Sequence, residues 1–256
     1  MSTQASSRDA LFAYALRLGD TSLVLGHRLS EWCGHAPELE EDIALTNIAL
    51  DLVGHARLLL TYAGDVEGKG RDEDRLAYRR DVFDYRNHLL AEQPNRDFGH
   101  TILRQFLHDA WAVELYERLA GSADATLAAI AAKAVKEVRY HVRHSGEWVV
   151  RLGDGTDASH ARMADALDRL WPYTGEMFER TAGEAELAAA GIAVDAAELK
   201  AAWTARVSAV LEEATLPRPA DGWMQSGGLR GEHSEHLGYL LAEMQFLQRA
   251  YPDATW

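Results

Sequence analysis

The chain has 256 residues, of which 47% are apolar, and it contains one cysteine, Cys33. A chain of this length can bury a hydrophobic core that needs no disulfide or structural metal to be stable. Its one cysteine excludes an internal disulfide and a metal–thiolate cluster. The net charge of −14 argues against nucleic acid or an anionic membrane as a general partner. Without a secretory signal or a run of eighteen apolar residues, we expect a soluble, cytoplasmic protein.

The N-terminal part of the chain predicts two long helices. Ser7 suits the N-cap of a helix over residues 8–32, whose apolar positions keep a helical period and which Gly34 can end. A second helix begins with an acidic first turn and covers about residues 37–63, where Gly64 stops it. The short connection makes the two helices antiparallel neighbours.

A polar loop and an arginine-rich segment come before the third long helix. Residues 64–74 predict a flexible loop, and residues 75–91 interleave arginines with aromatic residues. Either Asn95 or Asp97 caps the third helix, which ends near residue 120.

The fourth long helix, expected over residues 123–152, carries polar groups where an apolar stripe is usual. Glu137, His141, His144 and Trp148 fall at i, i+4, i+7 and i+11, so they share one face. A carboxylate and two imidazoles on that face need a partner from a neighbouring helix.

The remaining sequence also predicts helices. A helix over about residues 156–180 must bend or restart at Pro172, and Asp195 caps another that passes through Leu211. Residues 216–231, rich in proline and glycine, predict a long loop or small flap before a last helix over about 234–250.

No strand pattern of useful length occurs, so we predict an all-α fold. The bundle of four long helices covers about residues 8–153, and additional C-terminal helices cover about residues 156–251. We expect residues 1–256 to form a single domain.

Each of the four long helices carries a carboxylate in its middle. These residues are Asp20, Asp51, Asp109 and Glu137. This is the ground plan of carboxylate-bridged di-iron bundles, in which two helices give one acidic residue each and the other two give a Glu-x-x-His pair each. The ligands must converge on two metal ions and leave positions open for oxygen.

The spacing departs from that plan at both histidine positions. Gly54 stands three residues after Asp51, and Tyr140 stands three residues after Glu137. The imidazoles come one residue later, rotated by about 100°; they are His55 and His141. We favour a buried metal-free network, with Arg17, His55, Tyr140 and His141 as partners of the carboxylates. The alternatives are a metal bound in altered geometry by the two histidines and the four carboxylates, or a solvated face.

At this point the chain resembles the C-subunit family of bacterial phenylacetyl-CoA epoxidases, multicomponent oxygenases of aerobic phenylacetate breakdown. The segments that carry the resemblance are L-R-L-G-D (16–20), E-W-C-G-H-A-P-E-L-E (31–40), L-D-L-V-G-H-A-R (50–57), E-Q-P-N (92–95), K-E-V-R-Y-H-V-R (136–143), G-I-A-V-D (191–195) and E-H-L-G-Y-L-L-A-E-M-Q-F-L-Q-R (235–249). They follow one another across nearly the whole chain. Where relatives carry glutamine, this chain has His55.

The resemblance implies a ferritin-like subunit that has lost its metal site and has no cofactor or catalytic residue of its own. Its partners would be a homologous catalytic A subunit that holds the di-iron centre, in a heterodimer or a dimer of heterodimers, and a small B subunit. A reductase with flavin, an iron–sulfur centre and NADPH would supply electrons. The function would then be structural support of ring 1,2-epoxidation, and the alternative is a di-metal oxidase or oxygenase in its own right.

The arginine-rich segment adds a binding hypothesis on chemistry alone. Coenzyme A carries phosphates and adenine, which suit cations beside a stacking ring. The candidates for contact with an acyl-CoA or a partner subunit are Arg79, Arg80, Phe83, Asp84, Tyr85, Arg86 and Asn87. The alternative is that these arginines pair with Asp81 and Asp84 on a solvated face.

Overall fold

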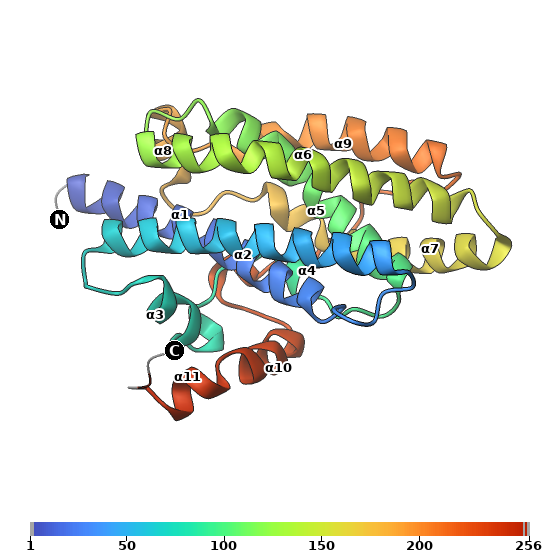
Figure 1. Cartoon of the computed structure of the whole chain (residues 1–256). Coiled ribbons are helices and arrows are strands. Elements are labelled where there is room, and N and C mark those ends of the chain that lie inside the picture. The colour runs from blue at the N-terminus through green and yellow to red at the C-terminus, as the bar shows by residue number, and fades with distance from the viewer. Residues whose placement is uncertain (1–2, 253, 255–256) are drawn as a thin grey trace.

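The computed structural model describes residues 3–252 and residue 254, with side chains from residue 7 onward. Within these ranges the chain forms α-helices and short 3-10 turns and contains no strand, which confirms the predicted all-α class. Figure 1 shows long helices lying roughly parallel or antiparallel to one another, with shorter helices at one side.

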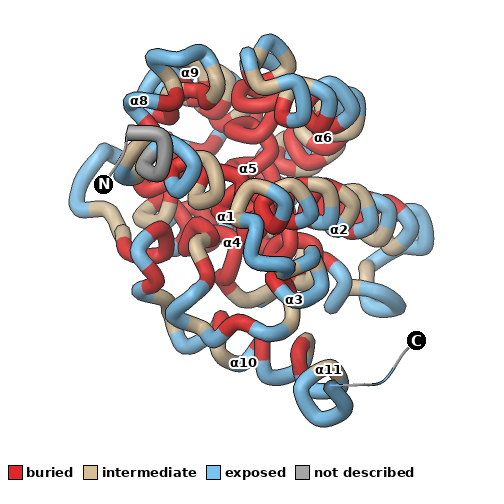
Figure 2. The backbone as a smooth tube through the Cα atoms, turned by 90° about the vertical axis from the view of Figure 1, so that its left-hand side faces the viewer, coloured by how far each residue is buried: buried red, intermediate tan, exposed pale blue. Residues whose placement is uncertain are grey.

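Four long helices form the bundle, as the sequence predicts. They are α1 (Thr3–Ser30), α2 (Leu39–Glu67), α5 (Phe98–Leu119) and α6 (Ala125–Gly153). α1 packs along α2, and α5 packs along α6 (Figure 1). α5 lies deepest, because every residue from His100 to Tyr116 is buried, and Figure 2 shows the buried backbone concentrated there.

Shorter helices cover the bundle. α7 (Asp157–Leu170) contacts α5 and α6, and α9 (Ala196–Glu213) packs on the same pair. α8 (Glu184–Ala189) contacts α1. Buried apolar side chains from α1 to α10 join in one cluster. That the whole chain is one domain stays a prediction.

Several helix ends follow the predicted chemistry. The side chain of Asp97 accepts a hydrogen bond from the backbone N–H of His100 at 2.8 Å, which decides between the two predicted caps of α5. Thr156 caps α7 and Asp195 caps α9 in the same way. Ser7 is not a cap, because α1 already begins at Thr3.

The predicted end of the second helix at Gly64 is wrong. α2 continues to Glu67 and ends at Gly68, which has a left-handed φ of 67°. Gly64 is required for a different reason, since a Cβ there would lie 2.1 Å from the backbone oxygen of Arg71. The glycine allows the following loop to fold back against the helix.

The segment between α2 and α5 folds as short pieces rather than one helix. It contains α3 (Glu73–Tyr78), the 3-10 turn η1 (Val82–Asp84) and α4 (Leu89–Glu92). Near Pro172 the predicted helix does not continue to residue 180, because α7 ends at Leu170 and is followed by 3-10 turns η2 (Trp171–Tyr173) and η3 (Gly175–Phe178).

The last predicted helix is divided in two. A long loop that contains η4 (Gly228–Arg230) leads to α10 (Glu235–Met244) and α11 (Phe246–Ala250), which lie below α3 and α4 in Figure 1. The break falls at Gln245, whose buried side-chain amide donates to the backbone oxygens of Ala77 and Arg80 at 3.1 and 3.0 Å. These two bonds hold α10 and α11 against the segment between α2 and α5.

Candidate functional site

The polar faces of α2 and α6 meet in a row of carboxylate–imidazole pairs. Nε2 of His55 lies 2.6 Å from Oε2 of Glu137, and Nε2 of His141 lies 3.0 Å from Oδ2 of Asp51. His144 continues the row, with its Nε2 2.9 Å from Oε2 of Glu41. Because the helices run antiparallel, the histidine of each helix meets the carboxylate of the other.

In the two central pairs the imidazoles are buried and the carboxylates are partly exposed. The imidazoles of His55 and His141 are 2% and 0% exposed, whereas Glu137 and Asp51 are 26% and 34% exposed. The carboxylates therefore lie at the rim of the seam and not at the centre of the bundle. The Nδ1 atoms of both histidines are buried without a hydrogen-bond partner among the described residues.

Asp20 of α1 takes a different partner from the one expected. Its Oδ2 lies 2.9 Å from Nη1 of Arg80 and accepts the backbone N–H of Arg86 at 2.9 Å, and the second oxygen also contacts the guanidinium. The predicted partner Arg17 instead faces Glu184 at 2.8 Å. Asp20 is fully buried, so this pairing neutralises its charge inside the protein.

The carboxylate of Asp109 in α5 is held by neutral donors. Nε2 of Gln105 donates to Oδ1 at 2.7 Å, and the hydroxyl of Ser145 donates to Oδ2 at 2.8 Å. Burial raises the pKa of Asp109 to about 6. The neighbouring His108 shows the converse effect, because burial and the nearby His141 lower its pKa to about 3.

Tyr140 does not join this network, which corrects its predicted role. Its side chain is 39% exposed, and its ring stacks on that of His144 with centroids 5.9 Å apart. Although Tyr140 follows Glu137 by three residues, its ring points outward, because α6 is only partly covered at that angle.

These residues do not fit a dinuclear metal centre. Asp20 is occupied by a guanidinium cation, and Asp51 and Glu137 each bind an imidazole that the altered-geometry hypothesis needs as a ligand. Among the described residues no group of three or more histidine, cysteine or acidic side chains is arranged to hold a metal. The arrangement is a set of internal hydrogen bonds with one buried ion pair, between Asp20 and Arg80.

The predicted binding segment does not form one surface, which corrects that hypothesis for three of its residues. Arg80, Tyr85 and Asn87 are buried. Tyr85 lies under the Arg80 guanidinium, 4.3 Å from the ring centroid, and Asn87 donates to Glu92 at 3.1 Å. These side chains hold the segment between α2 and α5 together, although Arg80 also borders a surface pocket.

The other members of that segment remain accessible to different degrees. Phe83 is 76% exposed, and Arg79 and Asp84 are also exposed. Arg86 is half-buried and donates to the backbone oxygens of Phe83 and Tyr85 at 2.7 and 2.6 Å. The expected solvated pairing within the segment is not seen at Asp81, which pairs instead with Arg249 of α11 at 2.6 Å.

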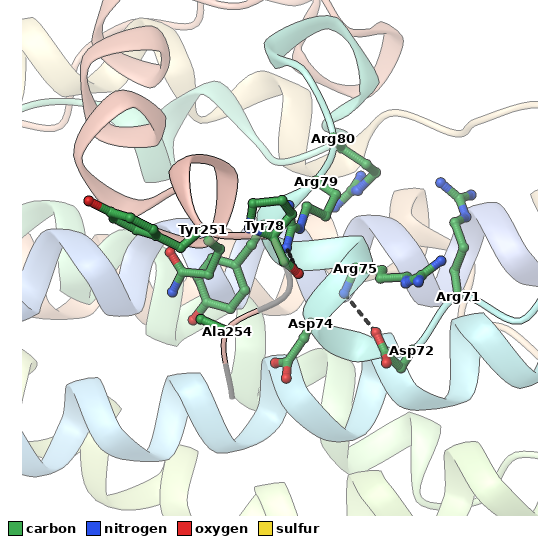
Figure 3. A pocket seen from close by; sticks show the side chains of 11 residues that line it. Arg71, Asp72, Asp74, Arg75, Tyr78, Arg79, Arg80, Tyr251 and Ala254 are labelled. Carbon is green, nitrogen blue, oxygen red and sulfur yellow. Dashed lines mark hydrogen bonds between the residues drawn. The ribbon is translucent and has the colours of Figure 1, made fainter. Parts of the chain in front are cut away.

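Sequence reasoning missed a pocket of about 870 Å³ between α3 and the C-terminal residues. Arg71, Arg75 and Arg79 lie along one side of it, and Figure 3 shows Tyr78 and Tyr251 beside them. Only Arg75 lies within α3, whereas Arg71 precedes the helix and Arg79 follows it, so no helical spacing in the sequence indicated the pocket. Two acidic residues, Asp72 and Asp74, also line it.

Comparison with known proteins identifies the family. The sequence model of the family described as phenylacetic acid catabolic protein matches residues 1–256. The chain belongs to this family. The C subunit of 1,2-phenylacetyl-CoA epoxidase from Escherichia coli K12 is 54% identical over 246 residues, which are 96% of this chain and 99% of the relative. The resemblance drawn from the sequence motifs is therefore confirmed, and the helical bundle is the ferritin-like fold expected of this family.

Proposed function

We propose that this family member is a non-catalytic structural subunit of a multicomponent phenylacetyl-CoA epoxidase. In this proposal it pairs with a homologous di-iron A subunit and supports that subunit during ring 1,2-epoxidation. The relative from Escherichia coli, a C subunit of such an epoxidase, supports membership of the complex, since it matches the chain over nearly its whole length.

The ion pair between Asp20 and Arg80 carries the non-catalytic part of the proposal. In a di-iron bundle the mid-helix carboxylate of each helix must turn its oxygens to the metals. Here both oxygens of Asp20 contact the buried Arg80 guanidinium, which already supplies the positive charge. If the Arg80 guanidinium moved away, the carboxylate of Asp20 would be left unpaired. The arrangement therefore favours a structural role for Asp20 over metal binding.

The other components follow from the same proposal. This chain would hold no cofactor; the A subunit would hold the di-iron centre, and a reductase with flavin, an iron–sulfur centre and NADPH would deliver electrons. A small B subunit would complete a cytoplasmic assembly, built on a heterodimer or a dimer of heterodimers, that needs neither nucleic acid nor a membrane. Any contact of this chain with phenylacetyl-CoA would use the accessible Arg79 and Phe83.

Reconstitution tests the proposal directly. The chain, the A subunit and the pair would each be assayed for epoxidation of phenylacetyl-CoA with the B subunit and reductase present. We expect no turnover by the chain alone, and turnover by the pair that exceeds that of the A subunit. Turnover by the chain without the A subunit would overturn the proposal, as would failure of the two to associate.

A further inference from the structure

A histidine in the loop before α10 places both of its ring nitrogens against oxygen atoms. Nε2 of His233 lies 3.0 Å from the backbone oxygen of Tyr85, and Nδ1 lies 3.0 Å from Oε2 of Glu92. The side chains of His233 and Glu92 are 1% and 0% exposed, so both contacts are shielded from bulk solvent. A backbone oxygen only accepts hydrogen bonds, and Nε2 must therefore carry a proton.

The state of the Glu92 carboxyl group decides whether Nδ1 carries a proton as well. The backbone N–H of Ser234 donates to its Oε1 at 2.7 Å, and the side-chain amide of Asn87 donates to its Oε2 at 3.1 Å. Donors on both oxygens favour the ionised form of a carboxyl group. An ionised carboxylate only accepts, so Nδ1 of His233 must donate to it. The contacts therefore describe an imidazolium–carboxylate ion pair, with a proton on each ring nitrogen.

The histidines between α2 and α6 differ in this respect. His55, His141 and His144 each contact a carboxylate through Nε2, while their Nδ1 atoms have no hydrogen-bond partner among the described residues. A neutral ring with its proton on Nε2 satisfies that arrangement. Within the part of the chain that the structure describes, His233 alone places both ring nitrogens against acceptors.

The carboxylate of Glu92 depends on His233 for a compensating charge. Arg28 of α1 lies nearby, but its Nε and Nη2 donate to the backbone oxygen of Glu92 at 3.2 and 3.0 Å. Its Nη1 faces the carboxylate of Glu31 at 2.7 Å. Arg28 thus holds the backbone of α4, whereas the side-chain charge of Glu92 is left to His233.

Other titratable groups come from the elements packed around this loop. Glu176 of η3 accepts the backbone N–H of Gly227 at 2.8 Å, and burial raises its pKa. Burial and the charge of Glu92 raise the pKa of Tyr173 in η2. The charged or titratable groups on the loop itself and at the start of α10 are Arg230, Glu232, Glu235 and His236. Histidine ordinarily changes charge near neutral pH, and His233, unlike the half-buried His236, does so in contact with a buried carboxylate.

α10 and α11, called here the C-terminal arm, follow directly after this pair. Figures 1 and 2 show the arm at one side of the bundle. Its buried apolar side chains are Leu237, Leu240 and Leu241, and none of the described residues of α11 is buried. A segment with few buried apolar contacts opens at a lower free-energy cost than the core. Polar contacts such as the one at His233 therefore contribute strongly to the attachment of the arm.

We propose that His233 and Glu92 form a pH-sensitive latch for the C-terminal arm. While the ring carries two protons, His233 binds Tyr85 and Glu92 at the same time. When Nδ1 loses its proton, the charge of Glu92 is left buried without a cation, which is costly. The latch is thus complete at low pH, and its contribution is lost as the pH rises and the proton leaves. The arm supplies Gln248 to the wall of the arginine-lined pocket, so its release would open that pocket on one side.

Nuclear magnetic resonance of the histidine ring nitrogens tests the protonation state in the purified chain. At about pH 7.5 a free histidine is mostly neutral. There the signals of the His233 ring, identified by their absence from His233→Gln, should show two protonated nitrogens. In Glu92→Gln the ring should be neutral, because the glutamine amide donates to Nδ1 and its oxygen still accepts the N–H of Ser234. A neutral His233 in the natural chain would overturn the proposal.

Hydrogen exchange of the arm amides tests the latch itself. Protection factors, which remove the intrinsic pH dependence of exchange, would be compared at about pH 6 and about pH 9. In the natural chain we expect the protection of α10 to fall by about tenfold or more over this range, relative to α5, because a charge-assisted hydrogen bond is lost. Glu92→Gln and His233→Gln should both change by less than about twofold, since neither contains the titrating pair.

His160→Gln is the matched control. Nδ1 of His160 also contacts a backbone oxygen, that of Gly153 at 2.7 Å, but this histidine belongs to α7. Its variant should keep the pH dependence of the natural arm. Equal protection of the natural arm at both pH values would overturn the proposal, and so would a pH dependence that persists in His233→Gln. These measurements use the chain alone, so their outcome is independent of the proposed function.

Discussion

Asp20 of α1 and Arg80 of the segment after α3 form a buried ion pair, with Oδ2 and Nη1 2.9 Å apart. The pair joins the bundle to the irregular segment, because the backbone N–H of Arg86 donates to the same carboxylate. A cation thus stands beside the α1 carboxylate, where the plan of a di-iron bundle places metal. Substitutions here distinguish structural use of this carboxylate from catalytic use.

Arg80→Met should lower the free energy of unfolding by about 3–5 kcal/mol, because it leaves Asp20 charged and buried. The double variant with Asp20→Asn should recover part of that loss, since no charge then remains unpaired. Urea unfolding measures both. Arg169→Met, which breaks an exposed pair with Asp165 in α7, is the control and should have little effect. An equally small loss for Arg80→Met would show that the buried pair does not stabilise the fold.

Asp109 should make the protein less stable as the pH rises from about 4 to about 6. Its pKa in the folded chain, about 6, lies above the usual 3.8, so the folded state holds a proton that the unfolded state has released in this range. Asp109→Asn should remove this effect and gain up to about 3 kcal/mol over the natural chain between pH 4 and pH 7. At pH 4 both side chains are neutral in the folded state, which provides the internal reference. Parallel stability profiles for the two proteins would contradict the assignment.

His108 should act in the opposite sense. Its pKa is lowered from 6.5 to about 3, so the unfolded chain takes up a proton that the folded chain refuses as the pH falls. Its contribution to stability is complete above pH 6.5 and is lost progressively toward pH 3. His108→Phe should therefore lose less stability than the natural chain on acidification, by up to about 3 kcal/mol at pH 4. An unchanged acid unfolding midpoint would argue against this histidine as the sensitive group.

Much of the bundle is predictable from the sequence, because helix periods and caps are local. Asp97, Thr156 and Asp195 act through backbone groups two or three residues away. Gly64 misled the prediction because its role depends on a backbone oxygen in a later loop. The break at Gln245 likewise depends on carbonyl groups far away in the sequence.

The residues of the site could be predicted from the sequence, whereas the partner of each residue could be predicted only in part. The four mid-helix carboxylates could be found from the sequence, and two of them do pair with the displaced histidines. Arg17 was a reasonable partner for Asp20 because it lies three residues away on the same helix. The actual partner, Arg80, comes from a segment without helical periodicity, whose path the sequence does not define. Likewise, Arg80 and Tyr85 look like surface groups until that path buries them.

The pair of His55 and Glu137 provides a test of the function of the α2–α6 seam. Glu137→Ala should destabilise the chain or weaken its association with the A subunit, because His55 loses its partner at a buried position. Turnover per assembled complex, measured with the variant chain in excess over the A subunit, should stay near the value of the natural complex. A variant that folds and assembles normally but abolishes turnover would instead show that Glu137 takes part in catalysis.

The most direct test of the non-catalytic interpretation is the iron content of this chain. Protein expressed alone would be reconstituted anaerobically with ferrous iron, desalted and measured by elemental analysis. We predict a value near zero irons per chain, because Asp20, Asp51 and Glu137 are held by Arg80, His141 and His55. A value near two irons per chain, with a visible spectrum that responds to oxygen, would contradict it and make the displaced histidines metal ligands.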